Sequence, residues 1–544
     1  MLRQFFSVGG LTALSRLTGF LREMTISALM GAGPLADAYF VALRLPNQFR
    51  AIFGEGAFNS AYVPTYSRLL TAQGHERARD FASRVLTLLA ISQVVLLALA
   101  YLLMPQLVEL IAPGFSKFPD KFALAVSMTY ITFPYLGLIT IVTLNSGTLN
   151  AHGYFAVPAF APVLLNLFIM GFLALSFAFP NAGYAASWGV LLSGVAQLAL
   201  LVWEARRRGV LERFAWPVMQ FDRAELTRYF NAEAATARGW RHELARRPWP
   251  KFDPDIKQFL RALGPAVIGS AGQQIAILAD TILASGMPTG SVSAINYADR
   301  LYQLPLGVIG VAAGTVLLPE MSRRLSRGDV VGAQAAQNRS MALSLALTAP
   351  FLVGFLLIPG ELVRGAYLRG AFTAAAAQNA ASVLMAYGFG LIPMVLIRSA
   401  VATFQSRGDT ATPANCFYVG LAFNVLLKLA LSGSMGPAGL ALATAVGAWI
   451  NFALLIVIGH RRGLARADDR LFENLALMLF ATAGAAVATL PSLALARALV
   501  HSVPFLRNEI VLVTTFAALS LAYGGLFAFA AQWMFGRGLR RQLL

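Results

Sequence analysis

Long apolar stretches separated by short polar segments recur from one end of the chain to the other. Each stretch is at least about 20 residues long, the length that an α-helix needs to cross a hydrocarbon core of about 30 Å. One helix per stretch predicts about fourteen transmembrane helices. They cover residues 4–31, 35–66, 81–111, 122–151, 156–179, 183–206, 256–286, 291–320, 335–358, 375–405, 413–433, 437–460, 471–499 and 508–535. The pattern therefore predicts an all-α polytopic membrane protein.

The polar segments between these helices alternate in charge. One set is rich in arginine: residues 68–84, 206–208, 323–327, 407, 461–466 and 537–541. The other set is short and nearly neutral: residues 31–34, 180–183, 286–290 and 433–437, with Lys117 and Lys121 among the exceptions on that side. Cytoplasmic segments of membrane proteins carry an excess of lysine and arginine. We therefore expect both chain termini in the cytoplasm, which requires an even number of helices.

Composition supports a membrane protein. Of 544 residues, 57% are hydrophobic and 12% are charged, whereas a soluble domain carries about 25% charged residues. The net charge of +18 does not predict a nucleic-acid partner, because the basic residues lack the interleaved aromatic residues of single-strand binders. The single cysteine, Cys416, allows no internal disulfide, and the five histidines are too scattered for a metal centre. Arg16 and Arg22 interrupt the first apolar stretch, so it predicts a retained helix rather than a signal peptide.

An internal repeat divides the chain into two halves. Pro64, Pro105, Pro158 and the pair Arg44-Leu45 recur after about 255 positions as Pro319, Pro359, Pro413 and Arg300-Leu301. This offset spans six predicted helices, so both copies have the same orientation in the membrane. Parallel repeats are related by an axis along the membrane normal, and we expect the substrate to bind between them.

The repeat predicts four segments. Residues 1–206 and 256–465 are two parallel six-helix lobes, and residues 466–544 hold two C-terminal helices without a counterpart. Residues 207–255 form a long, basic connector that contains three tryptophans. Such a segment is expected to lie on the anionic inner leaflet, and docking of a protein partner is the alternative.

Ionisable residues inside the predicted helices suggest a polar cavity, because charges within a bilayer are costly. They are Arg16, Arg22, Glu23, Asp37, Arg44, Arg50, Glu55, Asp280, Asp299, Arg300 and Arg398. For Arg16, Arg22, Arg50 and Arg300 we favour a cavity-lining role, since several guanidinium groups in one cleft bind a di-anion such as pyrophosphate. Snorkelling, or pairing with Asp37 and Glu55 within the protein, is the alternative and suits Arg44 better.

Several of these residues lie in longer motifs. The motifs are residues 15–22 (SRLTGFLR), 31–33 (GAG), 37–38 (DA), 45–47 (LPN), 54–58 (GEGAF), 112–115 (APGF), the prolines Pro158 and Pro162, 297–301 (YADRL) and 408–410 (GDT). Together they resemble the MurJ (MviN) family, the bacterial lipid II flippases of the multidrug/oligosaccharidyl-lipid/polysaccharide exporter superfamily. The resemblance extends over almost the whole chain, and the longer connector is the main departure.

The resemblance implies two six-helix lobes and two extra helices, which form a hydrophobic groove for a lipid tail. It implies a substrate site that includes Arg16, Arg22, Asp37, Arg50 and Arg300, with Asn47 and Glu55 nearby. Some members of the family hold a sodium ion in the C-terminal lobe through acidic residues. Asp280 and Asp409 are the counterparts in this sequence, and no other cofactor is expected.

The expected protein is a flippase and not an enzyme. Its substrate is lipid II, an undecaprenyl-pyrophosphate-linked disaccharide-pentapeptide, which it moves across the bacterial inner membrane to the periplasmic leaflet by alternating access. Cell-wall synthesis proteins are candidate partners. The nearest alternative is a flippase for another polyprenyl-pyrophosphate-linked saccharide, such as an O-antigen unit. A cation exporter would need an acidic cavity, and an enzyme acting on lipid pyrophosphate would need an aspartate cluster or a histidine nucleophile, neither of which the sequence contains.

Overall fold

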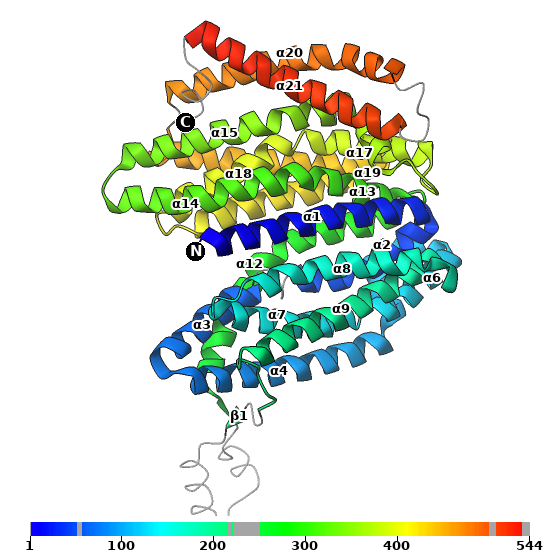
Figure 1. Cartoon of the computed structure of the whole chain (residues 1–544), viewed down its shortest axis with the longest axis vertical. Coiled ribbons are helices and arrows are strands. Elements are labelled where there is room, and N and C mark those ends of the chain that lie inside the picture. The colour runs from blue at the N-terminus through cyan, green and yellow to red at the C-terminus, as the bar shows by residue number, and fades with distance from the viewer. Residues whose placement is uncertain are drawn as a thin grey trace, which may run out of the picture. The chain divides into compact units, whose positions relative to one another are not determined.

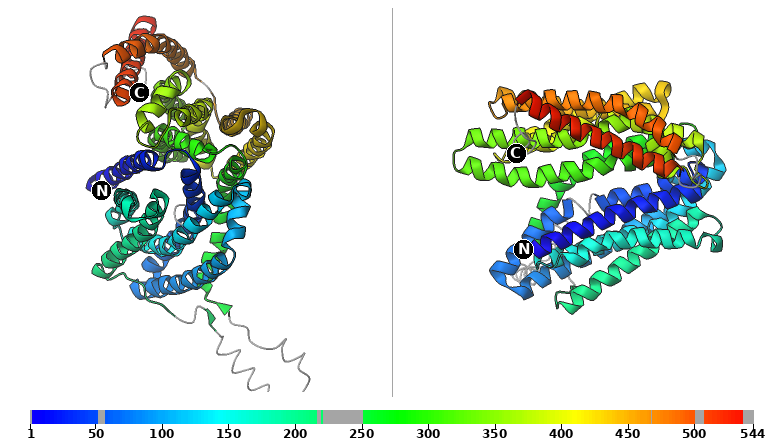
Figure 2. Two further views of the ribbon diagram at one scale, coloured as in Figure 1. Left: turned by 90° about the vertical axis from the view of Figure 1, so that its right-hand side faces the viewer. Right: turned by 45° about the horizontal axis from the view of Figure 1, so that its top comes forward.

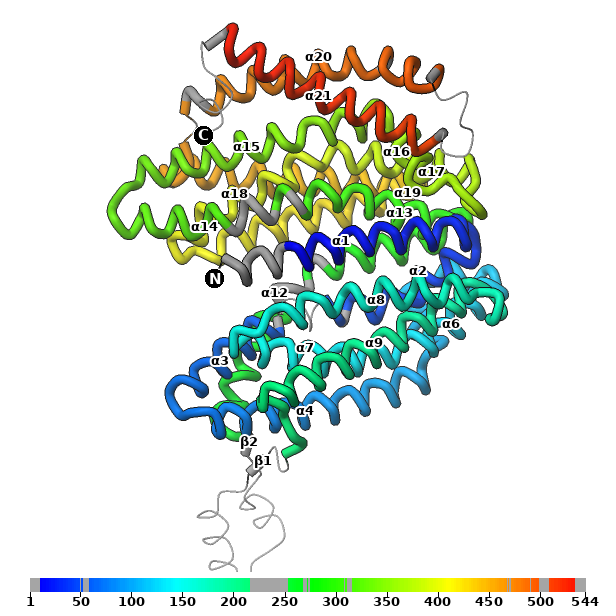
Figure 3. The backbone as a smooth tube through the Cα atoms, in the orientation of Figure 1, coloured from blue at the N-terminus to red at the C-terminus, as the bar shows by residue number. Residues whose placement is uncertain are grey.

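The structure, a computed structural model, describes residues 2–51, 57–215, 219–220, 251–466, 468–499 and 507–535. Figure 3 traces the backbone of the chain. Glu55 and most of the predicted connector lie outside the described residues.

Helices account for nearly all of the described chain. They are α1 (Leu2–Met30), α2 (Pro34–Phe49), α3 (Ala57–Gln73), α4 (His75–Leu102), α5 (Met104–Ile111), η2 (Pro113–Lys117), α6 (Pro119–Thr132), α7 (Tyr135–Ala151), α8 (Ala156–Ala174), η3 (Ser176–Ala178), α9 (Ala182–Arg207), α12 (Pro254–Ser285), α13 (Ser291–Pro305), η4 (Leu306–Gly310), α14 (Val311–Ser326), α15 (Val330–Leu357), α16 (Pro359–Tyr367), α17 (Ala374–Gly388), α18 (Leu391–Gln405), α19 (Ala411–Arg461), α20 (Asp469–Leu499) and α21 (Arg507–Phe535). Strands β1 (Met219–Gln220) and β2 (Lys251–Phe252) form a short antiparallel pair. The prediction of an all-α fold is confirmed.

In the described residues, most predicted spans coincide with one helix or with consecutive helices, and the predicted spans 413–433 and 437–460 share a single helix. Within the described ranges, nine helical segments are long and apolar enough to cross a membrane. One of them is α19, which covers two predicted spans and is kinked at Gly436 (φ 55°, ψ −140°), directly before Pro437. The protein is therefore a multi-pass membrane protein, and the exact number of fourteen spans stays a prediction.

At two of the prolines that interrupt helical hydrogen bonding, a hydroxyl group from another helix compensates for the missing donor. Pro46 has no N–H to donate to the carbonyl of Ala42, and the Thr132 hydroxyl donates to that oxygen instead, at 2.9 Å. Pro134 likewise leaves the carbonyl of Tyr130 without its helical donor, and the Tyr101 hydroxyl donates to it at 2.7 Å. Within a bilayer each freed carbonyl needs such a partner. The two hydroxyl groups therefore stabilise the helices where proline interrupts them.

The order of elements repeats along the chain, as the sequence predicts. Helices α4 and α15 are each 28 residues long, and each is followed by a short helix, α5 or α16. The broken helix α6–α7 corresponds to α17–α18, and the pair α8–α9 corresponds to the two halves of α19. In the described residues α20 and α21 come after both copies and lie side by side (Figures 1 and 2).

The chain forms two compact units, which are described one at a time. The first unit comprises Met1–Arg22, Ala42–Leu107 and Val126–Gln274, and the second comprises Glu23–Val41, Val108–Ala125 and Ile275–Leu544. Helices α1 and α2 therefore contribute residues to both units. The four segments predicted from the sequence, with boundaries at 206, 255 and 465, stay a prediction.

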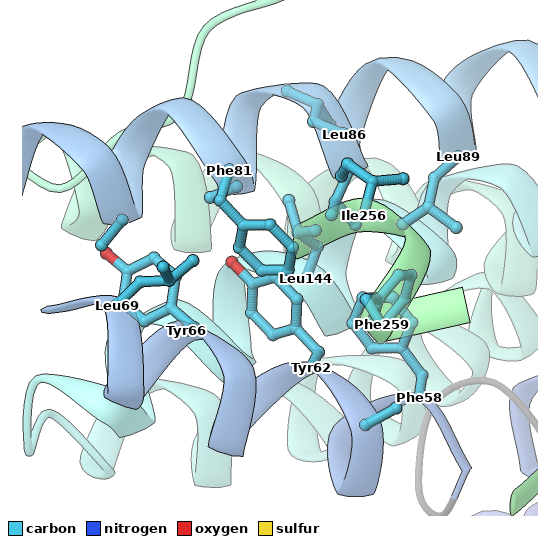
Figure 4. Close-up of a cluster of buried hydrophobic side chains, with 14 residues drawn as sticks. Phe58, Tyr62, Tyr66, Leu69, Phe81, Leu86, Leu89, Leu144, Ile256 and Phe259 are labelled. Carbon is cyan, nitrogen blue, oxygen red and sulfur yellow. The ribbon is translucent and has the colours of Figure 1, made fainter. Parts of the chain in front are cut away.

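An aromatic cluster forms part of the core of the first unit (Figure 4). Tyr62 of α3 stacks on Phe58 and on Phe81 of α4, with ring centroids 5.1 and 5.8 Å apart. Phe259 of α12 packs edge-on against both Tyr62 and Phe81. Offset and edge-to-face pairs of this kind stabilise a core beyond their buried area. They fix the start of α12 against α3 and α4.

The two ends of the connector are attached to α4 in the first unit. The backbone N–H groups of Arg213 and Ala215 donate to Ser83 Oγ and Thr87 Oγ1, each at 3.1 Å. At the other end, Asp253 accepts hydrogen bonds from Arg77 and Arg84, each at 3.0 Å. The strand pair joins these ends, since Gln220 pairs directly with Lys251.

This pairing leads to a prediction about the connector. Replacing residues 221–250 by Asn-Gly would join Gln220 to Lys251 through a two-residue hairpin turn, which suits an antiparallel pair. We expect the shortened protein to reach the membrane in normal amount and to support growth of a depleted strain, because both attachments to α4 remain. A matched variant with Asp253→Ala added should have a lower Tm, since it leaves Arg77 and Arg84 without that carboxylate. A stable shortened protein without activity would contradict the connector interpretation.

Candidate functional site

An asparagine of α8 orients Arg22 in the first unit. Arg22 Nη1 donates to Asn166 Oδ1 at 3.0 Å. The amide nitrogen of Asn166 donates to the Ser15 carbonyl and to Thr18 Oγ1, each also at 3.0 Å. Asn166 therefore uses both ends of its amide on α1. It fixes one edge of the guanidinium group, and it is not among the site residues predicted from the sequence.

The other predicted site residues of the first unit lie on α1 and at the end of α2. Arg16 is exposed, and it makes no ion pair with any residue that the structure describes. Asn47 and Arg50 are half-buried, and Arg50 lies in a π-helical turn that follows α2. Helix α1 coincides with a span predicted from the sequence, and within a membrane an unpaired guanidinium is costly without an anionic partner. The first unit thus holds a cation, Arg16, that a bound anion would neutralise.

Asp37 lies at the centre of a buried polar cluster in the second unit. Its carboxylate lies 2.7 Å from Lys121 Nζ of α6 and accepts a hydrogen bond from it. It also accepts hydrogen bonds from the N–H groups of Gly290 and Ser293, each at 2.8 Å, and from the Ser293 hydroxyl. We call these four residues the Asp37 latch. The latch joins α2 and α6, from the first half of the sequence, to α13 from the second.

The latch uses the N-terminus of α13. Gly290 is the N-cap of this helix and has no side chain that could accept a hydrogen bond from the first turn. Asp37 supplies that acceptor from another helix, and its negative charge suits the positive end of the helix dipole. Gly290 has a φ of +94°, and an added Cβ would lie 2.7 Å from the carbonyl oxygen of Ala32. Glycine is therefore required for this close approach.

Further contacts surround the latch in the second unit. The Tyr297 hydroxyl donates to the carbonyl of Gly31 at 2.8 Å, and the N–H of Ala371 donates to the carbonyl of Ala28 at 2.7 Å. Both acceptors belong to the turn between α1 and α2 or to the last residues of α1. The turn is thus held by side-chain and backbone donors from the second half of the chain.

Arg300 forms an ion pair within the second unit. Its Nε lies 3.3 Å from Oε1 of Glu23, which is 2% exposed, whereas the side chain of Arg300 is 41% exposed. The carboxylate compensates one side of the guanidinium and leaves the other side open to a ligand. Arg300 belongs to the second unit and Arg16, Arg22 and Arg50 belong to the first, so their shared role in one substrate site stays a prediction.

The structure adds three residues to those predicted from the sequence. Asn166, Lys121 and Ser293 all contact predicted site residues. Lys121 has a signal in the sequence, since it is a lysine on the side that the loop charges mark as periplasmic. The partner of Asp37 is a lysine, whereas an arginine partner is the alternative expected from the sequence. Among the described residues the donors to Asp37 are Lys121, Gly290 and Ser293, and its contact with substrate stays a prediction.

The two aspartates considered for sodium each face a cation of the protein. Asp280 Oδ1 lies 2.8 Å from Lys428 Nζ. Asp409 accepts hydrogen bonds from the N–H and hydroxyl of Thr412, at 2.9 and 2.7 Å, and from Arg462 at 3.0 Å. These hydrogen bonds, with those from Thr412 the strongest, lower the pKa of Asp409 below its usual range. In the part of the chain that the structure describes, no three His, Cys, Asp or Glu residues gather as a metal site would require.

Comparison with known proteins decides the family. The family model of the lipid II flippase MurJ matches residues 26–509. The chain belongs to this family. A protein of Rhizobium meliloti (strain 1021) named "Probable lipid II flippase MurJ" is 38% identical over 470 residues, which cover 85% of this chain and 81% of that protein. The "Lipid II flippase MurJ" of Burkholderia cenocepacia is 32% identical over 472 residues, which cover 85% of this chain and 84% of that one.

Solved structures agree with the fold of the MurJ family. A structure described as "Lipid II flippase MurJ, inward closed conformation" has a TM-score of 0.76 at 22% identity, covering 97% of this chain and 99% of that one. An inward-facing multidrug transporter of the MATE family has a TM-score of 0.66 at 14% identity, covering 83% of this chain and 95% of that one. These likenesses concern the fold alone. The family assignment favours lipid II over the alternative of an O-antigen unit.

Proposed function

We propose that this protein is a flippase that moves lipid II from the cytoplasmic to the periplasmic leaflet of the bacterial inner membrane. Membership of the MurJ family supports the substrate. The observation that carries the chemistry is Arg16, which lies in a span predicted from the sequence and has no ion-pair partner in the described chain. The pyrophosphate of a lipid-linked precursor would supply the missing negative charge.

Arg16 and Arg22 bind the pyrophosphate in this proposal. A guanidinium group donates two parallel hydrogen bonds to phosphate oxygens, which a lysine cannot do. Asn166 holds one edge of Arg22, so less side-chain entropy is lost when the phosphate binds. Arg50, Asn47 and Arg300 are the further predicted contacts, and Glu55 lies outside the described residues. No bond in the substrate is made or broken, so the protein acts as a transporter and not as an enzyme.

Alternating access requires that each side of the membrane can be closed. The loops at 31–34 and 286–290 belong to the nearly neutral set that is expected in the periplasm, and the latch lies beside both. The Asp37 latch therefore holds the periplasmic side closed, and release of the headgroup requires that it opens. Both termini are on the cytoplasmic side in this arrangement.

The proposed function is tested by depletion of the protein in its bacterium. Lipid II should accumulate in the cytoplasmic leaflet, where an enzyme added from the periplasmic side cannot reach it. The wild-type gene should restore access, and a variant with Arg16→Ala and Arg22→Ala should not. Accumulation of a different lipid-linked saccharide, with normal access to lipid II, would overturn the proposal.

The helices α20 and α21 are expected to accommodate the polyprenyl tail. Ala483 on α20 is exposed, whereas Ala485 is fully buried in a cluster with α15 and α21. Ala483→Trp should therefore block transport of the full-length lipid but affect a short-chain analogue much less. A charged residue at Ala485 would disturb helix packing and would not test the groove. Val94→Trp, at an exposed position of α4, is the matched control and should transport both lipids normally.

Photo-crosslinking of a long-chain lipid provides a second measurement on the same helices. Labelling should include residues of α20 or α21. Labelling confined to residues before 466 would contradict the groove. An Ala483→Trp variant that lost transport of the full-length lipid and of the short-chain analogue equally would also contradict it.

A further inference from the structure

Lys428 is fully buried in a membrane helix. It lies in α19, eight residues before the kink at Gly436, and its side chain has an exposed fraction of 0%. Its ammonium group lies 2.8 Å from Asp280 Oδ1 and donates to the carbonyl oxygen of Ala276 at 3.0 Å. Both partners belong to α12. A lysine at such a position is costly unless a negative charge and hydrogen-bond acceptors compensate for it.

The groups around this ammonium are oxygen ligands. A carboxylate oxygen and a backbone carbonyl oxygen are typical of sites for hard cations, including sodium sites of transporters. Asn424 precedes Lys428 by one helical turn and so lies on the same face of α19. Its Oδ1 is buried and accepts no hydrogen bond from any described residue. The site thus has oxygen ligands for a small cation. The ammonium group of Lys428 already lies among these oxygens.

The residues do not fit the sodium ion that the family resemblance implies. A sodium ion at Asp280 would lie where the Lys428 ammonium lies, and two adjacent cations would repel each other. Asp409 offers no substitute, because Thr412 and Arg462 already donate to its carboxylate. A sodium ion bound to Asp409 would have to displace the guanidinium group of Arg462.

We infer that Lys428 is a covalently attached cation that takes the place of sodium in this protein. The inference deepens the proposed function, on which it rests, by specifying how the transport is coupled. The Lys428–Asp280 pair joins α12 to α19 with a charge that is balanced without any dissolved ion. Lipid transport is therefore independent of the sodium gradient.

Thermal unfolding of the purified protein tests this inference without any transport assay. The wild-type Tm should be equal in sodium, potassium and choline chloride at the same ionic strength. Lys428→Ala removes the ammonium and leaves Asp280, the Ala276 carbonyl and Asn424 around a vacated position. The Tm of this variant should rise with sodium concentration and saturate, because a ligand that binds only the folded state stabilises it. The double variant Lys428→Ala/Asp280→Asn is the matched control and should show no sodium effect.

Either of two outcomes would overturn the inference. One is a wild-type Tm that rises specifically in sodium, and this measurement requires no variant to fold. The other is a folded Lys428→Ala protein whose Tm does not respond to sodium. If Lys428→Ala does not fold, Lys428→Ser replaces it and offers a hydroxyl oxygen as a further ligand. A purified wild-type protein that transports no lipid II in any salt would speak against the proposed function instead, whatever its Tm in sodium.

Discussion

Arg22→Ala is expected to abolish complementation of a depleted strain while the protein still accumulates in the membrane. The substitution removes a guanidinium group that Asn166 holds at 3.0 Å. Loss of one member of a close charge pair costs about 2 kcal/mol or more, which corresponds to about 30-fold weaker binding of the pyrophosphate. The measurement is lipid II binding by the purified variant, together with growth of the strain that carries it.

Two variants separate charge from orientation at this position. Arg22→Lys keeps the charge and loses the planar fork, so partial activity is expected. Asn166→Leu keeps Arg22 and removes the amide that orients it, so binding should weaken by less than in Arg22→Ala. Normal growth and normal binding with Arg22→Ala would contradict the assignment of Arg22 to the pyrophosphate. Equal binding by Asn166→Leu and the wild type would show that Asn166 is not a positioning residue.

Most of the fold could be predicted because hydropathy and repeat length dominate a membrane protein. The equal lengths of α4 and α15 follow from the repeat that Pro64 and Pro319 mark in the sequence. The breaks inside spans were not predicted, since dividing one apolar stretch into two helices leaves its hydropathy unchanged. At Pro134 the carbonyl of Tyr130 loses its helical donor and the Tyr101 hydroxyl replaces it, and such a distant donor cannot be identified from a local pattern.

The candidate site could be predicted only in part. Buried arginines are conspicuous in a sequence because charges are rare in membrane helices. Their partners are less conspicuous: Asn166 is one amide in an apolar stretch, and Ser293 is an ordinary serine 256 positions from Asp37. Lys121 could have been chosen, because it is a lysine in a segment that the charge pattern places outside the cytoplasm. Its role is evident only when α6 and α2 are seen together.

The second large effect is expected at the latch. Asp37→Ala leaves the Lys121 ammonium buried at 5% exposure without its carboxylate, and it removes the acceptor from two N–H groups and one hydroxyl. Removing one partner of a buried pair costs about 3–5 kcal/mol. The substitution therefore destabilises the conformation in which the latch is closed. We therefore expect Asp37→Ala to reduce the closed population strongly and to abolish transport.

Disulfide formation between cysteines introduced at Ala28 and Ala371 measures the closed population. The N–H of Ala371 donates to the carbonyl of Ala28 at 2.7 Å beside the latch, so the two cysteines are close only when this region is closed. The native Cys416 is first replaced by alanine. Crosslinking should be extensive with Asp37 and weak with Asp37→Ala. The charge-balanced variant Asp37→Ala/Lys121→Met should recover part of the crosslinking, because no unpaired ammonium remains. Crosslinking and transport that are unchanged by Asp37→Ala would show that the latch does not hold the closed state.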